Sequence, residues 1–324
     1  MSDPGGEDWR ATAAIGTLRQ RARLLAATRE FFAARGVLEV DTPLVVNAPV
    51  SDVHLHSARV TFANDARPFY LHTSPEYAMK RLLAGGSGDI YQICHVVRAL
   101  ERGRLHNPEF TLVEWYRLGW TLDELIGEVD ALVRALLGPR AEVRPLQRLS
   151  YRDAFLEHAG LDPFAAADTE LAAAARAAGF AGPAGGREES LELLMSTRVG
   201  PRLGKSALTF VHGYPASQAA LARLDPADPR TALRFELYCD GVELANGFHE
   251  LADPAEQRAR FGRDLAARRR LGLECAALDE RLLAALESGL PDCCGVALGF
   301  DRTVMLAVGA GSIDSVLAFP TERA

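Results

Sequence analysis

The dipeptide Asp240-Gly241 places the strongest constraint on the fold, because it separates two strand-like runs, RFELYC and VELANGFHE. A two-residue turn of this kind is typical of a β-hairpin, whose turn residues need positive φ. Pairing across the turn sets Cys239 opposite Val242, Tyr238 opposite Glu243, and Leu237 opposite Leu244. We therefore expect antiparallel sheet here.

The same hairpin places two carboxylates on one face of its sheet. Glu236 lies one diagonal step from Glu243, and such neighbours are roughly 7–8 Å apart at the backbone. Their repulsion is costly without a cation, and Mg²⁺ prefers carboxylates together with substrate phosphates. A β-bulge at Asn246-Gly247 is expected to turn Phe248 and Glu250 toward the same site. The alternative is an exposed acidic strand without a ligand.

Two further runs, DIYQICHVVR and PEFTLVEWYR, are expected to form a second hairpin around residues 99–107. Side chains alternate faces along a strand, so Phe110, Glu114 and Tyr116 share one face, and Arg98 stands at the mouth. A guanidinium matches phosphate oxygens, an aromatic ring can stack on a nucleobase, and a carboxylate beside a phenol can hold an ammonium. The array suits a substrate that combines phosphates, a base and an amine. The alternative is a surface hairpin with solvated charges.

A third segment, GVALGFDR, is typical of a strand, a turn and the start of a helix. Gly295 and Gly299 allow the backbone to approach a ligand closely. Asp301 can cap the helix, and Arg302 then stands in its first turn, where the helix dipole disfavours a cation. Arg302 therefore needs an anionic partner, either Asp301 or a triphosphate.

The remaining chain predicts an α+β protein. Helices are expected near residues 19–35, 121–137 and 254–271, and a short one in PEYAMKRLLAGG. Thr121 and Glu124 form a capping box, and Gly138 and Pro139 end that helix. Residues 145–200 are expected to form a mostly helical insertion with a loop at AGPAGG, and residues 1–14 a loose tail. Strands separate the helices irregularly and hairpins recur, which indicates an antiparallel sheet flanked by helices.

The composition argues against several classes of function. The net charge of −7 opposes general nucleic-acid affinity, although weakly. No apolar run approaches the about 20 residues of a membrane span, and the N-terminal MSDPGGEDWR lacks the order of a signal peptide. A cytoplasmic protein is expected. The five cysteines have no zinc-binding spacing, and only Lys80 and Lys205 are lysines.

Three segments, in their order along the chain, resemble the signature motifs of class II aminoacyl-tRNA synthetases. RGVLEVDTPLV resembles motif 1, VVRALERGRLHNPEFTLVEWY motif 2, and GVALGFDR motif 3. TSPEYAMKRLL, HNPEFT and ELANGFHEL are similar to the lysyl branch in particular. The resemblance runs from about Ile15 to the C-terminus and implies the class II catalytic fold.

Within that branch the chain is most similar to the family of elongation factor P (R)-β-lysine ligases, which are paralogues without the anticodon-reading OB-fold. FVHGYPASQAAL, PDCCGVALG and the length of 324 residues are typical of them. The resemblance implies ATP as co-substrate, Mg²⁺, (R)-β-lysine or lysine as substrate, and elongation factor P as the protein acceptor. It also implies a homodimer built through motif 1, with neither tRNA nor membrane as a partner.

The resemblance further implies roles for individual residues. Arg98 would hold the α-phosphate and the substrate carboxylate, and Arg302 the γ-phosphate. The ATP site would also include His106, Asn107, Phe110, Glu243, Leu244 and Gly299. The amino acid would be bound by Ser74, Pro75, Glu76, Glu114, Tyr116, Asn246, Phe248 and Glu250. Mg²⁺ would be held by Glu236 and Glu243.

Two departures from the lysyl pattern concern the substrates. Motif 2 usually reads Arg-Asn-Glu, whereas this chain reads Arg98-Ala99-Leu100, with Leu100 where the glutamate that contacts adenine is expected. Ala297 replaces a glycine of lysyl-tRNA synthetases, which favours β-lysine over lysine. Two alternatives stay open: an enzyme of the same fold that charges tRNA or releases a free adenylate, and an inactive binding paralogue.

Overall fold

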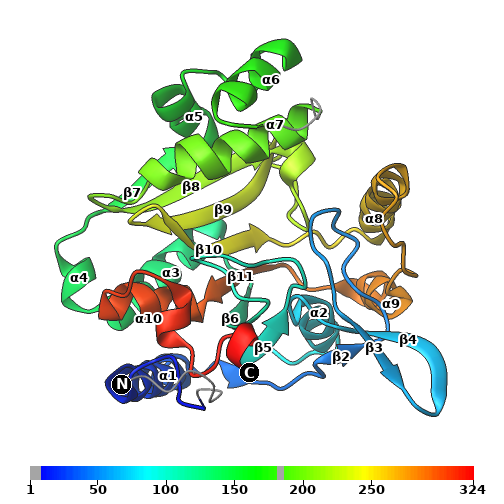
Figure 1. Cartoon of the computed structure of the whole chain (residues 1–324). Coiled ribbons are helices and arrows are strands. Elements are labelled where there is room, and N and C mark those ends of the chain that lie inside the picture. Colours follow the sequence, from blue (N-terminus) through cyan, green and yellow to red (C-terminus); the bar gives the residue numbers. More distant parts are fainter. Residues whose placement is uncertain (1–8, 181–185) are drawn as a thin grey trace, which may run out of the picture.

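An eight-stranded sheet forms the centre of the molecule in the computed structural model, which describes residues 9–180 and 186–324 (Figure 1). Its strands, in spatial order, are β1 (Leu38–Glu39), β5 (Ile90–Val97), β6 (Glu109–Leu118), β11 (Cys293–Gly299), β10 (Val242–His249), β9 (Thr231–Cys239), β8 (Leu208–Pro215) and β7 (Leu146–Ser150). The inner pairings are antiparallel, and the outermost pairing at each edge is parallel. The predicted α+β class is confirmed, with a parallel strand added at each edge.

A smaller three-stranded sheet lies beside this centre. Its strands are β2 (Val45–Val46), β4 (Asp65–Leu71) and β3 (Arg59–Phe62), in that order. The motif 1 segment therefore contributes to two sheets, since β1 pairs with β5 and β2 pairs with β4.

Helices cover one face of the large sheet and only the ends of the other. The covered face packs on α1 (Ile15–Ala33), α3 (Leu122–Leu137) and α10 (Phe300–Val308) through one apolar core. Trp115 belongs to that core, whereas the next residue, Tyr116, packs among α2 (Glu76–Ala84), α8 (Pro254–Arg270) and α9 (Glu280–Gly289). Consecutive strand residues point to opposite faces, so this second helix group lies on the other face.

The far end of that second face is covered by the segment predicted as an insertion. It contains α5 (Tyr151–Ala159), α6 (Asp168–Ala177), α7 (Arg187–Leu194) and the π-helical turn η1 (Met195–Val199). These helices pack on Val211, Tyr214 and Tyr238 in a separate apolar cluster. The short elements are α4 (Pro139–Glu142), η2 (Gly200–Arg202), η3 (Ala216–Gln218), η4 (Ile313–Val316) and η5 (Thr321–Arg323).

The hairpin around Asp240-Gly241 forms as predicted at its turn but not along its whole length. Both turn residues have positive φ, 53° and 77°, and the first two predicted pairs, beginning with Cys239 and Val242, are present. Leu237 pairs with Ala245 instead of Leu244, because the bulge falls between Glu243 and Ala245. The prediction of a bulge at Asn246-Gly247 is therefore wrong. The Leu244 side chain is buried in the main core, which accounts for the extra residue at that point.

The predicted helices are present with small shifts at their ends. The capping box of α3 forms, since Thr121 accepts a hydrogen bond from the Glu124 amide and Glu124 accepts one from the Thr121 amide. The helix expected at residues 19–35 begins earlier and ends earlier, at Ile15 and Ala33. None of the helices in the described ranges is long and apolar enough to span a bilayer.

Two predicted loops fall partly outside the described residues. Residues 1–8 of the predicted tail and residues 181–185 of the AGPAGG loop lie outside them. The tail prediction fails for Thr12 and Ala13, whose amides donate to the carbonyls of Ala318 and Leu317 at 2.8 and 3.1 Å. The chain around Thr12 and Ala13 therefore runs beside the C-terminal segment, below α10 in Figure 1.

Candidate active site

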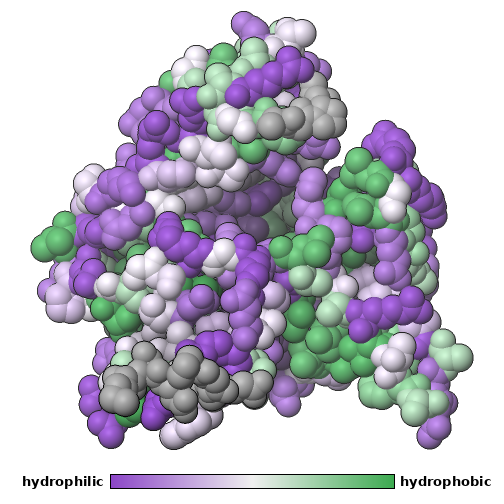
Figure 2. Space-filling model, viewed as in Figure 1, coloured by the Kyte–Doolittle hydropathy of each residue, from purple (hydrophilic) through white to green (hydrophobic). Residues whose placement is uncertain are grey.

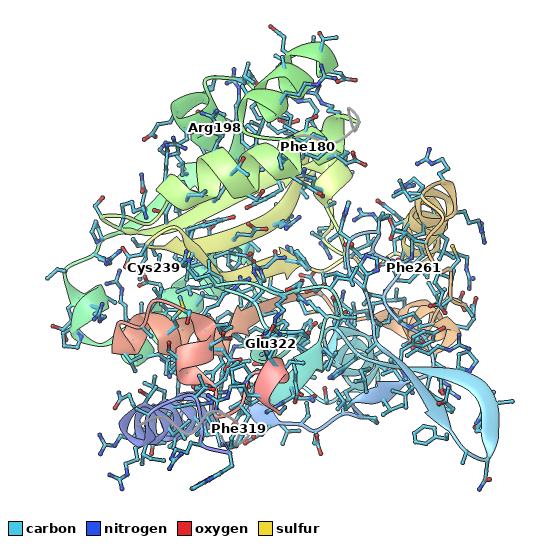
Figure 3. All side chains as sticks on the ribbon, in the orientation of Figure 1. Phe180, Arg198, Cys239, Phe261, Phe319 and Glu322 are labelled. Atoms are coloured by element: carbon cyan, nitrogen blue, oxygen red, sulfur yellow. The ribbon has the colours of Figure 1, made fainter. Side chains whose placement is uncertain are left out.

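The sheet face that the helices leave open forms the floor of a cleft. Figure 2 shows a hollow near the centre of this face, lined with hydrophilic residues. In Figure 3, Phe180 of the insertion lies above this region and Phe261, buried where α8 packs on α2 and α9, lies to its right. The floor is built from the central strands β6, β11, β10 and β9, so the predicted residues of both hairpins and of the third segment meet here.

Arg302 lies in the first turn of α10, against the end of β10. Its guanidinium donates to the carbonyl of Glu243 at 3.0 Å and to that of Leu105 at 3.2 Å. It also contacts Nε2 of His106 at 2.7 Å and the Glu243 carboxylate at 3.5 Å. Burial lowers the pKa of His106, and the Arg302 charge lowers it further, so the ring is a neutral acceptor for this arginine.

Asp301 does not have the role predicted for it. Gly299 is the N-cap of α10, and Asp301 is buried, where it accepts the Thr111 amide at 2.8 Å and pairs with Arg21 of α1. The predictions that Asp301 caps the helix or balances Arg302 are therefore wrong, because its carboxylate is committed on the opposite face. The anionic partner of Arg302 within the chain is Glu243.

Arg98 stands at the mouth of the β5–β6 hairpin, as predicted. Its guanidinium lies 5.1 Å from the centre of the Phe110 ring. It contacts the carbonyl of Thr73 at 3.4 Å and the carboxylate of Glu101 at 3.2 Å. Burial lowers the pKa of His106 and the charges of Arg98 and Arg302 lower it further, while burial raises the pKa of Glu243 and the same two charges oppose that rise. The two arginines therefore share one end of the cleft.

Glu114 lies deeper in the cleft and is fully enclosed. Its carboxylate accepts hydrogen bonds from the hydroxyl groups of Ser74 at 2.7 Å and Tyr116 at 2.8 Å. Ser74 also accepts the amide of Glu76 at 3.0 Å, which fixes the start of α2, where Pro75 is the N-cap. Burial raises the pKa of Glu114 to about 7, and Glu76 adds to the shift.

Glu76 and Glu250 meet at a buried lysine. The Lys80 ammonium lies 2.7 Å from the Glu76 carboxylate and 2.6 Å from that of Glu250. Burial raises the pKa of Glu250 to about 8, against the opposing effect of Lys80. Burial alone would lower the pKa of Lys80, but the two carboxylates outweigh it and the pKa is raised. Lys80 therefore stays charged inside the protein.

Gly295 leaves the room that this acidic end needs. A Cβ atom there would lie 2.3 Å from the Tyr116 ring and 2.4 Å from the Glu250 carboxylate. Contacts that short do not occur, so any larger residue would displace one of these two groups. Gly299 is different, because a Cβ there would meet only ordinary contacts of 3.7 Å or more.

Comparison with known proteins identifies the family of this chain. The family model for class II tRNA synthetases (D, K and N) matches residues 7–323. The chain belongs to this family. It is 49% identical to a Vibrio cholerae protein named elongation factor P--(R)-beta-lysine ligase, over 98% of this chain and 99% of that one. Proteins of the same name from Klebsiella pneumoniae strain 342 and Pasteurella multocida are 48% and 46% identical, over 98% of this chain in each case.

The class II synthetase family leads us to test the acidic pair on β9 and β10 as a metal site. Glu236 accepts hydrogen bonds from Tyr214 and Tyr238, both at 2.6 Å, and pairs with Arg234. A carboxylate has about four lone-pair sites, so one is left on Glu236. Burial raises the pKa of Glu243, and the Glu236 charge adds to the shift. The carboxylates of Glu236 and Glu243 repel each other, and a divalent cation bound to both would relieve that repulsion. The pair therefore fits Mg²⁺.

No larger metal cluster is present in the residues that the structure describes, since no group of three or more His, Cys, Asp or Glu side chains there is arranged to hold a metal ion. In this synthetase-family protein the phosphates of the nucleotide would have to complete the coordination shell.

Asn246 and Phe248 reach the cleft in spite of the shifted bulge. Asn246 lies opposite Glu236 in the ladder, and Phe248 lies opposite Arg234. The Arg234 guanidinium donates to the Asn246 side-chain oxygen at 3.2 Å and lies 5.9 Å from the centre of the Phe248 ring. Arg234 therefore links Glu236 of the acidic pair to Asn246 and Phe248, two residues predicted to bind the amino acid.

Two predicted ATP-site residues are committed to the protein itself. The Asn107 amide is buried, donates to the carbonyl of Glu109 at 2.6 Å and accepts the amide of Thr321 at 3.1 Å. Its side chain therefore holds the C-terminal segment beside the loop. The Leu244 side chain is buried in the main core, so only its backbone can face a nucleotide.

The two departures from the lysyl pattern lie in different surroundings. Leu100 is 73% exposed on the loop between β5 and β6, where the adjacent Glu101 turns to Arg98. Ala297 pairs with Glu114 on one side and with Asn246 on the other. Its methyl group therefore forms part of the cleft floor between two predicted substrate-binding residues.

Sequence reasoning missed Lys80 and Arg234, the two cations that hold the carboxylates of the cleft. One signal was available for Lys80, since it lies one helical turn after Glu76 in a chain with only two lysines. A local signal was also available for Arg234, since it stands two residues before its partner Glu236 on the same face of β9. Its other partners, on β10 and in the chain before β9, gave none.

Proposed function

We propose that this protein is an ATP-dependent ligase that activates (R)-β-lysine, or lysine, as an aminoacyl-adenylate and transfers it to a lysine ε-amine of elongation factor P. The relatives that carry this activity in their names cover nearly the whole chain. The observation that carries the proposal is one cleft with two opposite electrical poles. Arg98 and Arg302 lie at one end, and three carboxylates, Glu76, Glu114 and Glu250, lie at the other.

A short path joins the two poles. Arg98 contacts the carbonyl of Thr73, and the next residue, Ser74, donates to Glu114. An amino acid whose ammonium groups lie among the carboxylates therefore has its own carboxylate beside Arg98. The ring of Phe110, next to Arg98, supplies a face for the adenine.

The first step is attack of the amino-acid carboxylate on the α-phosphorus of ATP. A new oxygen–phosphorus bond forms, the bond to the bridging oxygen breaks, and pyrophosphate leaves. Arg98 neutralises charge at the α-phosphate and Arg302 at the γ-phosphate, so catalysis consists of positioning and charge stabilisation. When bound by Glu236 and Glu243, Mg²⁺ supplies further positive charge to the phosphate oxygens.

The second step is attack of the acceptor lysine amine on the acyl carbon. The carbon–nitrogen bond forms, AMP leaves with the electrons of the acyl–oxygen bond, and the amine gives up a proton to water. No nucleophile of the enzyme is needed. Burial raises the pKa of Cys94 to about 12 and that of Cys239 to about 11, so these thiols are not poised to form a thioester.

The exposed residues of motif 1 support a homodimer. Leu38, on the edge strand β1, is 54% exposed, and Leu44, just before β2, is 40% exposed. Exposed apolar residues on a sheet edge are typical of a protein interface. Sedimentation equilibrium should therefore give twice the chain mass. We also place the reaction in the cytoplasm, with its translation-factor acceptor.

The test is ATP–pyrophosphate exchange with a panel of amino acids, followed by transfer. Exchange should be fastest with (R)-β-lysine or lysine, and label should pass to elongation factor P and not to tRNA. Label on tRNA, or adenylate released without transfer, would favour the other enzymes of this fold. Calorimetry that detects no binding of ATP with Mg²⁺ would instead indicate an inactive paralogue.

A further inference from the structure

Lys80 holds a charge at the acidic end that the proposed reaction does not use. Its side chain is 1% exposed, and its ammonium bridges Glu76, one turn earlier on α2, and Glu250, which follows β10. Transferring a charge from water into the protein interior costs free energy unless that charge is paired there. A lysine in this position therefore does more than fill space, because its charge changes what else the cleft can hold.

The charges that face this end can be counted from the surrounding elements. The groups near Glu250 are Glu76 and Lys80 from α2, Glu114 and Tyr116 from β6, and Cys293 and Cys294 from β11. Arg223 donates to the Glu250 carbonyl at 3.3 Å, and its charge is paired with Asp292, which His249 also contacts. Tyr116 is neutral because burial raises its pKa well above its ordinary value, and burial likewise raises the pKa of both thiols. Three carboxylates therefore face one fixed ammonium.

We propose that Lys80 determines substrate specificity: its ammonium cancels one of the three carboxylate charges and leaves a deficit of two positive charges, which a diamino acid supplies. This inference rests on the proposed function and names what makes that site select its substrate. An amino acid with one ammonium leaves a buried carboxylate without a cation. Without Lys80 the deficit is three, and a diamino acid no longer fills it.

The protonation of the carboxylates agrees with this count. Burial raises the pKa of Glu114 to about 7 and that of Glu250 to about 8. Near neutral pH, protons therefore occupy part of the deficit when no substrate is bound. The two ammonium groups of the substrate displace these protons, so binding releases protons and is stronger at higher pH.

The competing explanation is that Lys80 only holds α2 in place. If Lys80 has only a structural role, its replacement lowers activity equally at every pH. If its charge balances the carboxylates, its replacement also changes the pKa of these neighbours. The test therefore compares Lys80→Met, which keeps the length but not the charge, with Lys205→Met, which removes the exposed second lysine at the β9–β10 turn. Both are measured in the full chain by pyrophosphate exchange between pH 6 and 9.

We expect Lys80→Met to lower kcat/KM for the diamino acid at pH 7 by at least about tenfold and to move the midpoint of the pH profile upward by about one unit or more, because losing a nearby cation raises carboxylate pKa values. The preference over norleucine, which lacks the second amine, should fall as well. Lys205→Met should match the unaltered protein. A lower rate with an unmoved midpoint would overturn the inference.

Two further measurements decide the matter if Lys80→Met does not fold. Lys80→Ala should regain activity with added propylammonium and not with 1-propanol, which has the same shape without the charge. Equal rescue by both would overturn the inference.

In the unaltered protein, calorimetry in buffers of different ionisation enthalpy should show proton release when the diamino acid binds at pH 7, and no release would also overturn the inference. If the unaltered protein activates no diamino acid, the proposed function itself is wrong.

Discussion

The two ends of the cleft hold their charges in opposite ways. At the acidic end, Lys80, Glu114 and Glu250 are each at most 2% exposed, and their partners lie within the protein. At the opposite end, where we propose that the nucleotide binds and which we call the nucleotide end, the side chains of Arg98 and Arg302 are 26% and 19% exposed. They rest on backbone carbonyls and on partly exposed carboxylates, contacts that an arriving phosphate can replace.

This difference separates selectivity from rate. A ligand that leaves a buried, fixed charge unpaired binds much more weakly, because an unpaired charge costs more free energy in a low dielectric. Partly exposed arginines exchange partners readily and act mainly where charge develops during the reaction. We therefore expect changes at the acidic end to alter which substrate is used, and changes at the nucleotide end to alter how fast any substrate reacts.

The largest effect is expected at the nucleotide end. Arg302→Ala should lower the rate of pyrophosphate exchange by about 10²–10³-fold with every amino acid that is activated, because it removes a preorganised positive charge from the phosphates. Arg270→Ala, which changes an exposed arginine of α8, is the matched control. A selective loss for one amino acid alone would contradict the separation of the two ends.

A smaller and more selective loss is expected for Glu114→Gln. A hydrogen bond to a charged group contributes about 1.5–3 kcal/mol, so kcat/KM for the diamino acid should fall about 10- to 100-fold. The affinity for ATP, measured by calorimetry, should change little. Glu30→Gln, on the exposed side of α1, serves as the control. Exchange with (R)-β-lysine at the unaltered rate would show that Glu114 does not bind the amine.

The pH dependence of stability should come from the acidic end. Glu114 and Glu250 have raised pKa values, about 7 and about 8, so the folded state binds their protons more tightly than the unfolded chain. Their contribution to the free energy of unfolding is complete below the ordinary carboxylate pKa and is lost as the pH rises toward 8. A saturating diamino acid should therefore raise Tm by about 2–4 °C more at pH 8.5 than at pH 6. A shift that is equal at both values would argue against these protonation states.

The smallest effect is expected on the exposed loop of the nucleotide end. Leu100→Glu would restore the glutamate usual in motif 2, and one added hydrogen bond to adenine contributes about 0.5–1.5 kcal/mol. The KM for ATP should therefore fall about 2- to 10-fold. Leu100→Ala should leave it unchanged, because the leucine is 73% exposed. If both variants behave alike, adenine is recognised elsewhere.

Local sequence signals predicted the frame of this site, and long-range packing decided the rest. The capping box of α3 and the turn at Asp240-Gly241 depend only on neighbouring residues, and both formed. The bulge moved to Leu244 because that side chain is buried in a core built by distant helices. Asp301 was assigned wrongly for the same kind of reason, since its partner Arg21 lies 280 positions away along the chain.

The resemblance named the residues of the cleft, but it did not reveal what holds them. Phe110, Glu114 and Tyr116 share a face because a strand alternates, which the sequence predicted together with the place of Arg98 at the mouth of the hairpin. That Lys80 bridges Glu76 and Glu250 depends on how α2 lies against the end of β10. No periodicity in one chain encodes that placement, so ion pairs between separate elements stay hidden until the structure is known.

The burial of Lys80 also limits how far the adenylate can acylate the lysines of the protein itself. An aminoacyl-adenylate acylates accessible amines, and Lys205, whose ammonium donates to the carbonyl of Asp240 at 3.0 Å, is the one lysine side chain left at the surface. The other basic side chains are chiefly arginines, which keep their protons and do not attack acyl groups. Among lysine side chains, adenylate that escapes the cleft therefore meets only Lys205, and labelling of lysine is confined to the turn beside Asp240.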